Sequence, residues 1–171
     1  MRSAELRQFV DYLFWVNRRL LDAAAGLSPE AFASTSGDTV RDLRATLVHE
    51  LDVEWSWRLV LQGRPEEEWS SAVELKPEDF DDVATLRARW DEEERELRGW
   101  VATLGDEELA AETRPALTGE ALPLWYFVMH IVMHGTQQQA DAATLLTRAG
   151  RSPGEIGFLE FVAEQRGVRR R

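Results

Sequence analysis

Two histidines, His130 and His134, stand four residues apart in the segment from 122 to 149, LPLWYFVMHIVMHGTQQQADAATLLTRA. Four residues are slightly more than one helical turn, so in a helix both imidazoles leave the same face. Such a pair binds one divalent metal ion when a third ligand comes from elsewhere in the chain. The one other histidine in the sequence is His49, far upstream on a separate predicted helix. The three histidines therefore form a candidate metal site.

A structural interpretation of the same residues is a buried polar network, in which each imidazole hydrogen-bonds a neighbour. Carboxylates on the same two segments are candidates to orient a metal-binding imidazole through its second ring nitrogen. Asp141 is the best placed, two turns beyond His134 on the same face. The others are Glu50, Asp52 and Glu54, and each of the four is otherwise an ordinary charge.

Small and aromatic residues near the histidines also have two interpretations. Gly135, beside His134, either permits the close approach of another helix or is simply tolerated small packing. Tryptophans at helical spacing either line an apolar pocket or belong to the core, as most such aromatics do. The four candidates for a pocket are Trp15, Trp55, Trp57 and Trp125.

Length, charge and hydropathy restrict the class of protein. A chain of 171 residues is expected to form one domain, residues 1–171, with a substantial core. A formal net charge of −11 argues against a nucleic-acid partner, because phosphate binding needs clustered lysine and arginine. The one basic run, Arg169–Arg171, is interpreted as a solvated tail.

No apolar run approaches the roughly 20 residues that span a bilayer, and the N-terminus lacks the apolar core of a signal peptide. We therefore expect a cytoplasmic protein with no membrane contact. The sequence contains no cysteine, which excludes disulfides, a thiolate nucleophile and cysteine-ligated zinc. Any thiol chemistry would need a thiol supplied by a small molecule.

Apolar residues recur at three- and four-residue steps in four long segments, as in amphipathic helices. The predicted helices cover residues 4–25, 39–62, 82–104 and 123–149, with Asp38 or Thr39 as the cap of the second. The connection from 64 to 81 is long and acidic, which is typical of a crossover along a bundle. A β-hairpin turning at residues 118–120 and a short C-terminal helix complete the elements. The fold class is all-α: a four-helix bundle with a long crossover, a small β-hairpin before the last long helix, and a short C-terminal helix.

Residue patterns assign the faces of the middle two helices. The predicted core stripe of the second helix is Val40, Leu43, Leu47, Leu51 and Leu61. His49 lies on another face, beside mostly small or polar residues, so this face is either the wall of a partly open cavity or plain solvent surface; the neighbours are Asp42, Ala45, Val53, Ser56 and Val60. A run of charges on the third helix predicts a solvated face: Arg87, Arg89, Asp91, Glu92, Glu93, Glu94 and Arg95.

Three stretches together resemble the DinB-like (DinB/YfiT) superfamily of bacterial four-helix proteins. They are YLFWVNRRLLDAAAGLS, LVHELDVEWSW and LWYFVMHIVMHGTQQQADAATLLTRAGRSPGEIGFLEF, of which the last is the most specific. The resemblance implies an up-down-down-up bundle, often dimeric, with one metal held by three histidines in a cleft between helices. It also implies chemistry on a low-molecular-weight thiol such as mycothiol or bacillithiol.

One position departs from the family pattern. Relatives commonly carry a histidine four residues past the position of His134, where this chain has Gln138. His130 and Gln138 would lie about 12 Å apart along a helix, so they would not share a metal with His134. The candidate ligand sets are therefore exclusive: His49, His130 and His134, or His49, His134 and Gln138. Glutamine is a poor zinc ligand beside imidazole, so the second set would bind metal weakly or not at all.

Two functions follow as hypotheses. The first is a metal-dependent enzyme, a low-molecular-weight-thiol S-transferase or related hydrolase, that uses a histidine-bound divalent ion such as zinc or nickel on a small-molecule substrate. The second is a non-catalytic, dimeric binding protein whose metal site has degenerated. DNA binding, which the family name suggests, is disfavoured by the net charge.

Overall fold

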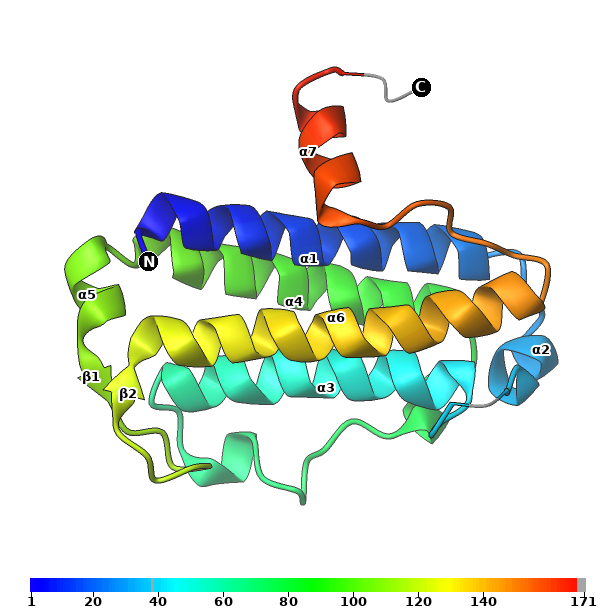
Figure 1. Cartoon of the computed structure of the whole chain (residues 1–171). Helices are drawn as coiled ribbons and strands as arrows, with labels where there is room; N and C mark the ends of the chain where they lie inside the picture. Colours follow the sequence, from blue (N-terminus) through cyan, green and yellow to red (C-terminus); the bar gives the residue numbers. More distant parts are fainter. Residues whose placement is uncertain (38, 169–171) are drawn as a thin grey trace.

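Four long helices lie side by side in the computed structural model, which describes residues 1–37 and 39–168. They are α1 (Ser3–Ala24), α3 (Leu43–Leu61), α4 (Val83–Thr103) and α6 (Leu124–Arg148). α1 and α6 run in one direction and α3 and α4 in the other (Figure 1), so the bundle has the expected up-down-down-up order. The prediction of an all-α four-helix bundle is confirmed.

Shorter elements occupy the ends of the bundle and the connections. The crossover from α3 to α4 runs along the outside of the bundle (Figure 1), and the predicted hairpin is a pair of two-residue antiparallel strands. The short helix α7 projects from the bundle at an angle (Figure 1) and packs Phe158 and Phe161 against Tyr12 and Trp15 of α1. The turn or short helical piece that Ser28-Pro29 predicts is α2, whereas the sequence did not predict the short helix α5. The shorter elements are α2 (Pro29–Ser34), η1 (Glu66–Glu68), η2 (Pro77–Asp79), α5 (Asp106–Ala110), β1 (Glu112–Thr113), β2 (Leu122–Pro123) and α7 (Phe158–Gln165).

The helix that carries His49 begins later than predicted. Asp42 caps α3, because its side chain accepts a hydrogen bond of 2.8 Å from the backbone N–H of Ala45. Thr39, a predicted cap, donates its hydroxyl to the carbonyl of Arg41 in the preceding turn. The other predicted cap, Asp38, lies outside the described residues. The later start explains why Val40, predicted in the core, is 89% exposed.

Glu54 is a buried carboxylate at which the four long helices meet. Its Oε1 accepts a hydrogen bond of 2.9 Å from Asn17 Nδ2 of α1, and its Oε2 accepts one of 2.8 Å from Trp90 Nε1 of α4. Asn17 Oδ1 in turn accepts a hydrogen bond of 2.6 Å from Gln139 Nε2 of α6. We call Asn17, Glu54, Trp90 and Gln139 the interior network; all four side chains are buried.

A second buried polar contact corrects the sequence prediction for α4. Glu93 was predicted on a solvated face, but it is fully buried and pairs with Arg58 of α3, with Nη2 and Oε2 2.7 Å apart. Its position follows the core spacing of the helix, three residues after Trp90 and four before Leu97. The charged residue type predicted solvent exposure, but the helical position of Glu93 places it in the core. The buried charge is tolerated because the guanidinium of Arg58 on the neighbouring helix compensates it.

The interior network predicts how stability depends on pH. Burial raises the pKa of Glu54 to about 8, and the hydrogen bonds from Trp90 and Asn17 oppose this only in part. The unfolded chain releases this proton near its ordinary pKa of 4.5, so the folded state holds the extra proton between the two values. The free energy of unfolding should therefore fall as pH rises from about 4.5 to about 8, by on the order of 4 kcal/mol from this group. In Glu54→Gln most of this fall should disappear, as measured by urea denaturation near both ends of the range.

An exposed residue provides the control for this prediction. Glu92 is exposed on α4, so Glu92→Gln should retain the wild-type pH dependence. Glutamine can accept only one of the two N–H groups that Glu54 satisfies, which should lower stability by about 1 kcal/mol or more at every pH. The test is how steeply the free energy of unfolding changes with pH, and not this constant difference between the two proteins. Equal slopes in the wild-type protein and Glu54→Gln would contradict the prediction.

Candidate functional site

His49 of α3 and His134 of α6 face each other across the most extensive helix–helix contact in the described bundle. Their Nε2 atoms are 3.3 Å apart, and their ring planes meet at 76°. Two imidazole nitrogens that bind one tetrahedral zinc ion at about 2.0–2.1 Å lie about 3.3 Å from each other. The spacing of this histidine pair therefore fits two adjacent positions around a metal ion.

His130 has a different environment from the other two histidines. Its ring centroid is 6.3 Å from that of His134 and 4.9 Å from the ring of Trp57, and the side chain is exposed. In the described part of the chain, no group of three or more histidine, aspartate or glutamate side chains is arranged to hold a metal ion. The structure thus brings His49 and His134 together and places His130 one turn away, against Trp57.

The alternative third ligand, Gln138, lies one turn beyond His134 on α6 and is half-buried. No hydrogen bond within residues 1–37 and 39–168 occupies its side-chain amide. His130 and Gln138 therefore stand on either side of His134 along α6, one turn away in each direction.

The protonation of the histidines suits metal binding. Burial lowers the pKa of His134 to about 4, with smaller contributions from the positive charges of His49, His130 and Arg41. Burial also lowers the pKa of His49, with Arg41 adding to the effect and Glu74 opposing it. Burial alone lowers the pKa of His130. All three imidazoles are therefore neutral near pH 7, which is the form that donates a lone pair to a metal.

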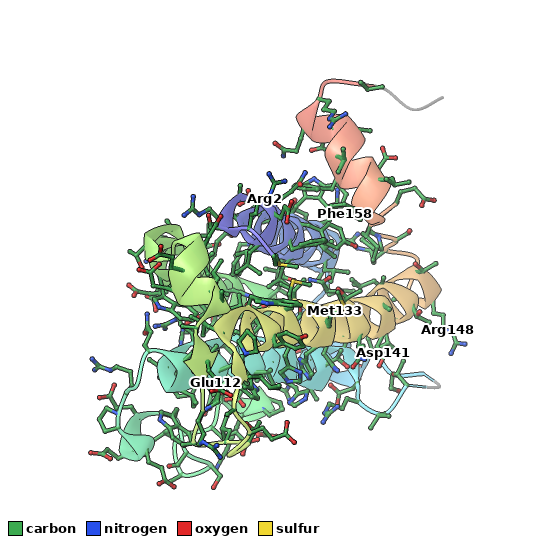
Figure 2. The ribbon with its side chains drawn as sticks, turned by 60° about the vertical axis from the view of Figure 1, so that its left-hand side comes forward. Arg2, Glu112, Met133, Asp141, Arg148 and Phe158 are labelled. Atoms are coloured by element: carbon green, nitrogen blue, oxygen red, sulfur yellow. The ribbon has the colours of Figure 1, made fainter. Side chains whose placement is uncertain are left out.

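The carboxylates predicted to orient the histidines do not hydrogen-bond them in the described structure. Asp52 instead accepts a hydrogen bond of 2.8 Å from the backbone N–H of Leu75 in the crossover, and Glu54 belongs to the interior network. Asp141 lies farther along α6, toward Arg148 (Figure 2). The Nδ1 atom of His134 is buried and has no hydrogen-bond partner among the described residues.

Glu50 is a fully buried carboxyl group next in sequence to His49. Both of its oxygens lack a hydrogen-bond partner in the described structure. Burial raises the pKa of Glu50 well above its ordinary value; the neighbouring Glu54 adds to this effect, and the Gln139 side chain opposes it.

Gly135 provides the space that Glu50 occupies. A Cβ atom at this position would lie 3.1 Å from Glu50 Oε1 and 2.4 Å from Leu13 Cδ1. The interpretation of Gly135 as a site of close helix approach is therefore confirmed. The glycine lets α1 and α3 pack closely on α6 directly beside His134.

Two pockets adjoin the histidines. The one beside His49, of about 190 Å³, is lined by the end of the 35–42 loop, α3 and the crossover, and includes Arg41, Asp52 and Glu74. The one beside His130, of about 230 Å³, includes Trp57 and Phe127. A pocket does lie next to His49, but of the five neighbours predicted to share its face only Ala45 lines it; Asp42, Val53, Ser56 and Val60 do not. A further pocket of about 400 Å³ lies at the α2 end of α1 and α4, lined by none of the histidines.

Sequence reasoning missed several lining residues. Tyr126 and Phe127 line the pocket of His130, and they precede it by four and three residues, a spacing that would have identified them. Arg41 precedes the cap of α3, so the predicted earlier helix start obscured its position. Of the four tryptophans proposed for a pocket, only Trp57 lines one of the two beside the histidines. The other three pack elsewhere: Trp15 against Phe161, Trp55 under Arg89, and Trp125 against Tyr126.

Substitution of Gly135 tests the close approach beside His134. An alanine in an exposed helix normally stabilises by about 1 kcal/mol relative to glycine. In Gly135→Ala the Cβ would overlap the buried Leu13 side chain, and we expect a net loss of about 1–3 kcal/mol of unfolding free energy in urea denaturation.

Gly99 of α4 provides a matched control, because a Cβ there would meet no atom within 4 Å. Gly99→Ala should raise the unfolding free energy by about 0.5–1 kcal/mol. A stabilising effect of Gly135→Ala similar to that of Gly99→Ala would show that the helices are not in close contact at His134.

A sequence model of the DinB family matches residues 1–167. The match includes the three histidines, Gln138 and both adjoining pockets. No protein among the curated sequences matches the chain. Within the described residues, none of the helices is both long and apolar enough to cross a membrane.

Proposed function

The chain belongs to the DinB family, and from its facing histidines we propose that it is a metal-dependent enzyme, a low-molecular-weight-thiol S-transferase or a related hydrolase. The single observation that supports this proposal best is the 3.3 Å separation of His49 Nε2 and His134 Nε2. This distance, which is also that of a hydrogen bond between the two rings, is compatible with two imidazole ligands of one divalent ion, such as zinc or nickel.

His49 and His134 could provide two ligands of such an ion, and a third ligand is needed. His130 supplies it if its ring turns from Trp57, and Gln138 supplies it if the amide oxygen binds. When bound, the ion would lower the pKa of a thiol or water at its open position. With no cysteine in the chain, the thiol is a small molecule such as mycothiol or bacillithiol.

The pocket beside His49 suits the polar body of a small thiol. Arg41 provides a guanidinium for an anionic group, and Glu74 provides a carboxylate for an ammonium or hydroxyl group. The hydrogen bond from Leu75 to Asp52 holds the crossover against α3, so this wall is in place before a substrate binds. The proposed enzyme acts on small molecules in the cytoplasm, as a homodimer, without nucleic acid or membrane partners.

Metal content tests the ligands. Protein purified without a histidine tag should bind zinc, and His49→Ala should weaken binding by about 100-fold or more, because one of two preplaced nitrogens is lost. The measurement is competition against a chelating dye, with elemental analysis of the purified protein. Sub-stoichiometric metal that does not respond to His49→Ala would reject the metal-dependent enzyme.

Two further variants identify the third ligand. If Gln138 occupies that position, Gln138→His should raise zinc affinity by at least about tenfold, and His130→Ala should have little effect. If His130 completes the set, Gln138→His should change zinc affinity little and His130→Ala should lower it. Gln137→His provides the control, because Gln137 is the exposed neighbour of Gln138. An equal gain in Gln137→His and Gln138→His would indicate non-specific chelation.

Gln138 also favours a second function, a non-catalytic dimeric binding protein with a degenerate metal site. Exposed apolar side chains in and just after α7 are available for self-association: Leu159 is 60% exposed and Val168 is 57% exposed. This function predicts a dimer in sedimentation analysis that binds zinc only after Gln138→His. Zinc binding by the wild-type protein excludes it.

A further inference from the structure

The pocket beside His130 is the most aromatic of the described pockets. Three rings line it, Trp57 from α3 and Tyr126 and Phe127 from α6; the other lining residues are Thr118, Glu120, Leu122 and His130. The rings of Trp57 and Phe127 are nearly parallel, with centroids 6.0 Å apart. We call this the aromatic pocket.

The size of the aromatic pocket matches a single ring with a small substituent. Its volume is about 230 Å³, and a cavity of about 150 Å³ holds one benzene ring. Tyr126 is 47% exposed, which is high for a large aromatic side chain. No hydrogen bond within the described residues engages its hydroxyl group. An entering ring would bury apolar surface that water now covers.

The aromatic pocket adjoins the histidine pair on the side of His130. Trp57 lies eight residues after His49 on α3, about 12 Å along the helix axis. His130 bridges this interval, because its ring contacts Trp57 and lies one turn from His134. A group bound in the aromatic pocket would therefore present its inner edge to His130 and its outer edge to solvent.

The outer wall of the aromatic pocket is held by hydrogen bonds within the hairpin loop. The carbonyl of Pro115 accepts a hydrogen bond of 3.0 Å from the N–H of Gly119, which has a left-handed φ of 67°. Arg114 donates to the carbonyl of Gly119, and the Thr118 hydroxyl accepts from the N–H of Glu120. This wall is thus formed without a ligand.

Charge restricts the occupant. Glu120 is the only charged residue that lines the aromatic pocket, and no lysine or arginine lines it. A carboxylate or sulfonate would find no cation there and would be repelled by Glu120. The pocket of His49 differs, since it contains Arg41, Asp52 and Glu74. The two pockets are therefore chemically distinct.

We propose that the aromatic pocket binds an uncharged aromatic ring of a substrate, placing the reactive substituent of that ring at His130. The role of this ring in catalysis rests on the proposed function. In that reaction the small thiol would enter beside His49 and the aromatic substrate beside His130. Binding of the ring itself needs no metal, since every lining group belongs to the protein.

Fluorine NMR with three matched probes tests the proposal. The probes are 4-fluorobenzyl alcohol, 4-fluorobenzoate and 4-fluorobenzylammonium, each added to chelator-treated protein and to zinc-treated protein. The alcohol should bind with a dissociation constant on the order of 1 mM, and benzoate at least about tenfold more weakly. The alcohol should also shift the imidazole proton signals of His130. Tighter binding of benzoate or of the ammonium than of the alcohol would overturn the assignment.

Variants locate the probe. Trp57→Ala should weaken alcohol binding by about tenfold and Tyr126→Ala by about threefold. Because Tyr126 is exposed, its variant tests the pocket even if Trp57→Ala fails to fold. Met133→Ala provides the control, since Met133 is exposed on α6 outside the pocket and should leave binding unchanged. Equal effects of Tyr126→Ala and Met133→Ala would overturn the proposal.

Two outcomes separate this inference from the proposed function. Alcohol binding by a protein that fails to bind zinc would reject the metal enzyme and retain the aromatic pocket. Zinc binding without alcohol binding would reject the aromatic pocket alone. A dimer that the alcohol dissociates, and that Tyr126→Ala converts to a monomer in sedimentation analysis, would assign the pocket to a second copy of the chain and overturn the proposal.

Discussion

The hydrogen bonds around Glu54 are the constraint on which the arrangement of the bundle depends. A carboxyl group removed from water must find donors, and here they come from α1 and α4, while α6 joins through Gln139. Leucine contacts alone would tolerate small sliding of one helix past another, but these directional bonds do not. His49 and His134 lie on two of the helices that the interior network joins, so a requirement for hydrogen bonding in the core also fixes the separation of two side chains at its edge.

Polar groups follow the inner side of α3 for much of its length. Glu50, Glu54 and Arg58 occur at four-residue intervals, and all three are buried. Arg58 forms an ion pair with Glu93, Glu54 accepts two hydrogen bonds from neutral donors, and burial raises the pKa of Glu50. Burial also lowers the pKa values of His49 and His134, so the imidazoles beside this row are neutral near pH 7.

Sequence periodicity was sufficient for the four long helices, the crossover and the hairpin, because each depends on local spacing and turn residues. It also identified the three histidines as candidates, since His130 and His134 share a helical face and His49 is the remaining histidine. It did not predict that Glu93 is buried, because the compensating Arg58 is distant in sequence. It could not choose between His130 and Gln138, since the choice depends on rotamers and on the position of Trp57. The walls of the two pockets were missed for a related reason: they are built from connections, whose paths depend on tertiary contacts such as that between Asp52 and Leu75.

The origin of the pocket walls has an evolutionary consequence. The histidines come from α3 and α6, whereas the crossover contributes a wall to the pocket beside His49 and the hairpin loop contributes one to the pocket beside His130. Connections tolerate insertion and replacement far better than packed helices do. Either loop can therefore be exchanged without disturbing the core. A bundle built this way can change the lining of each pocket by changing one surface segment, while the histidine pair stays in place.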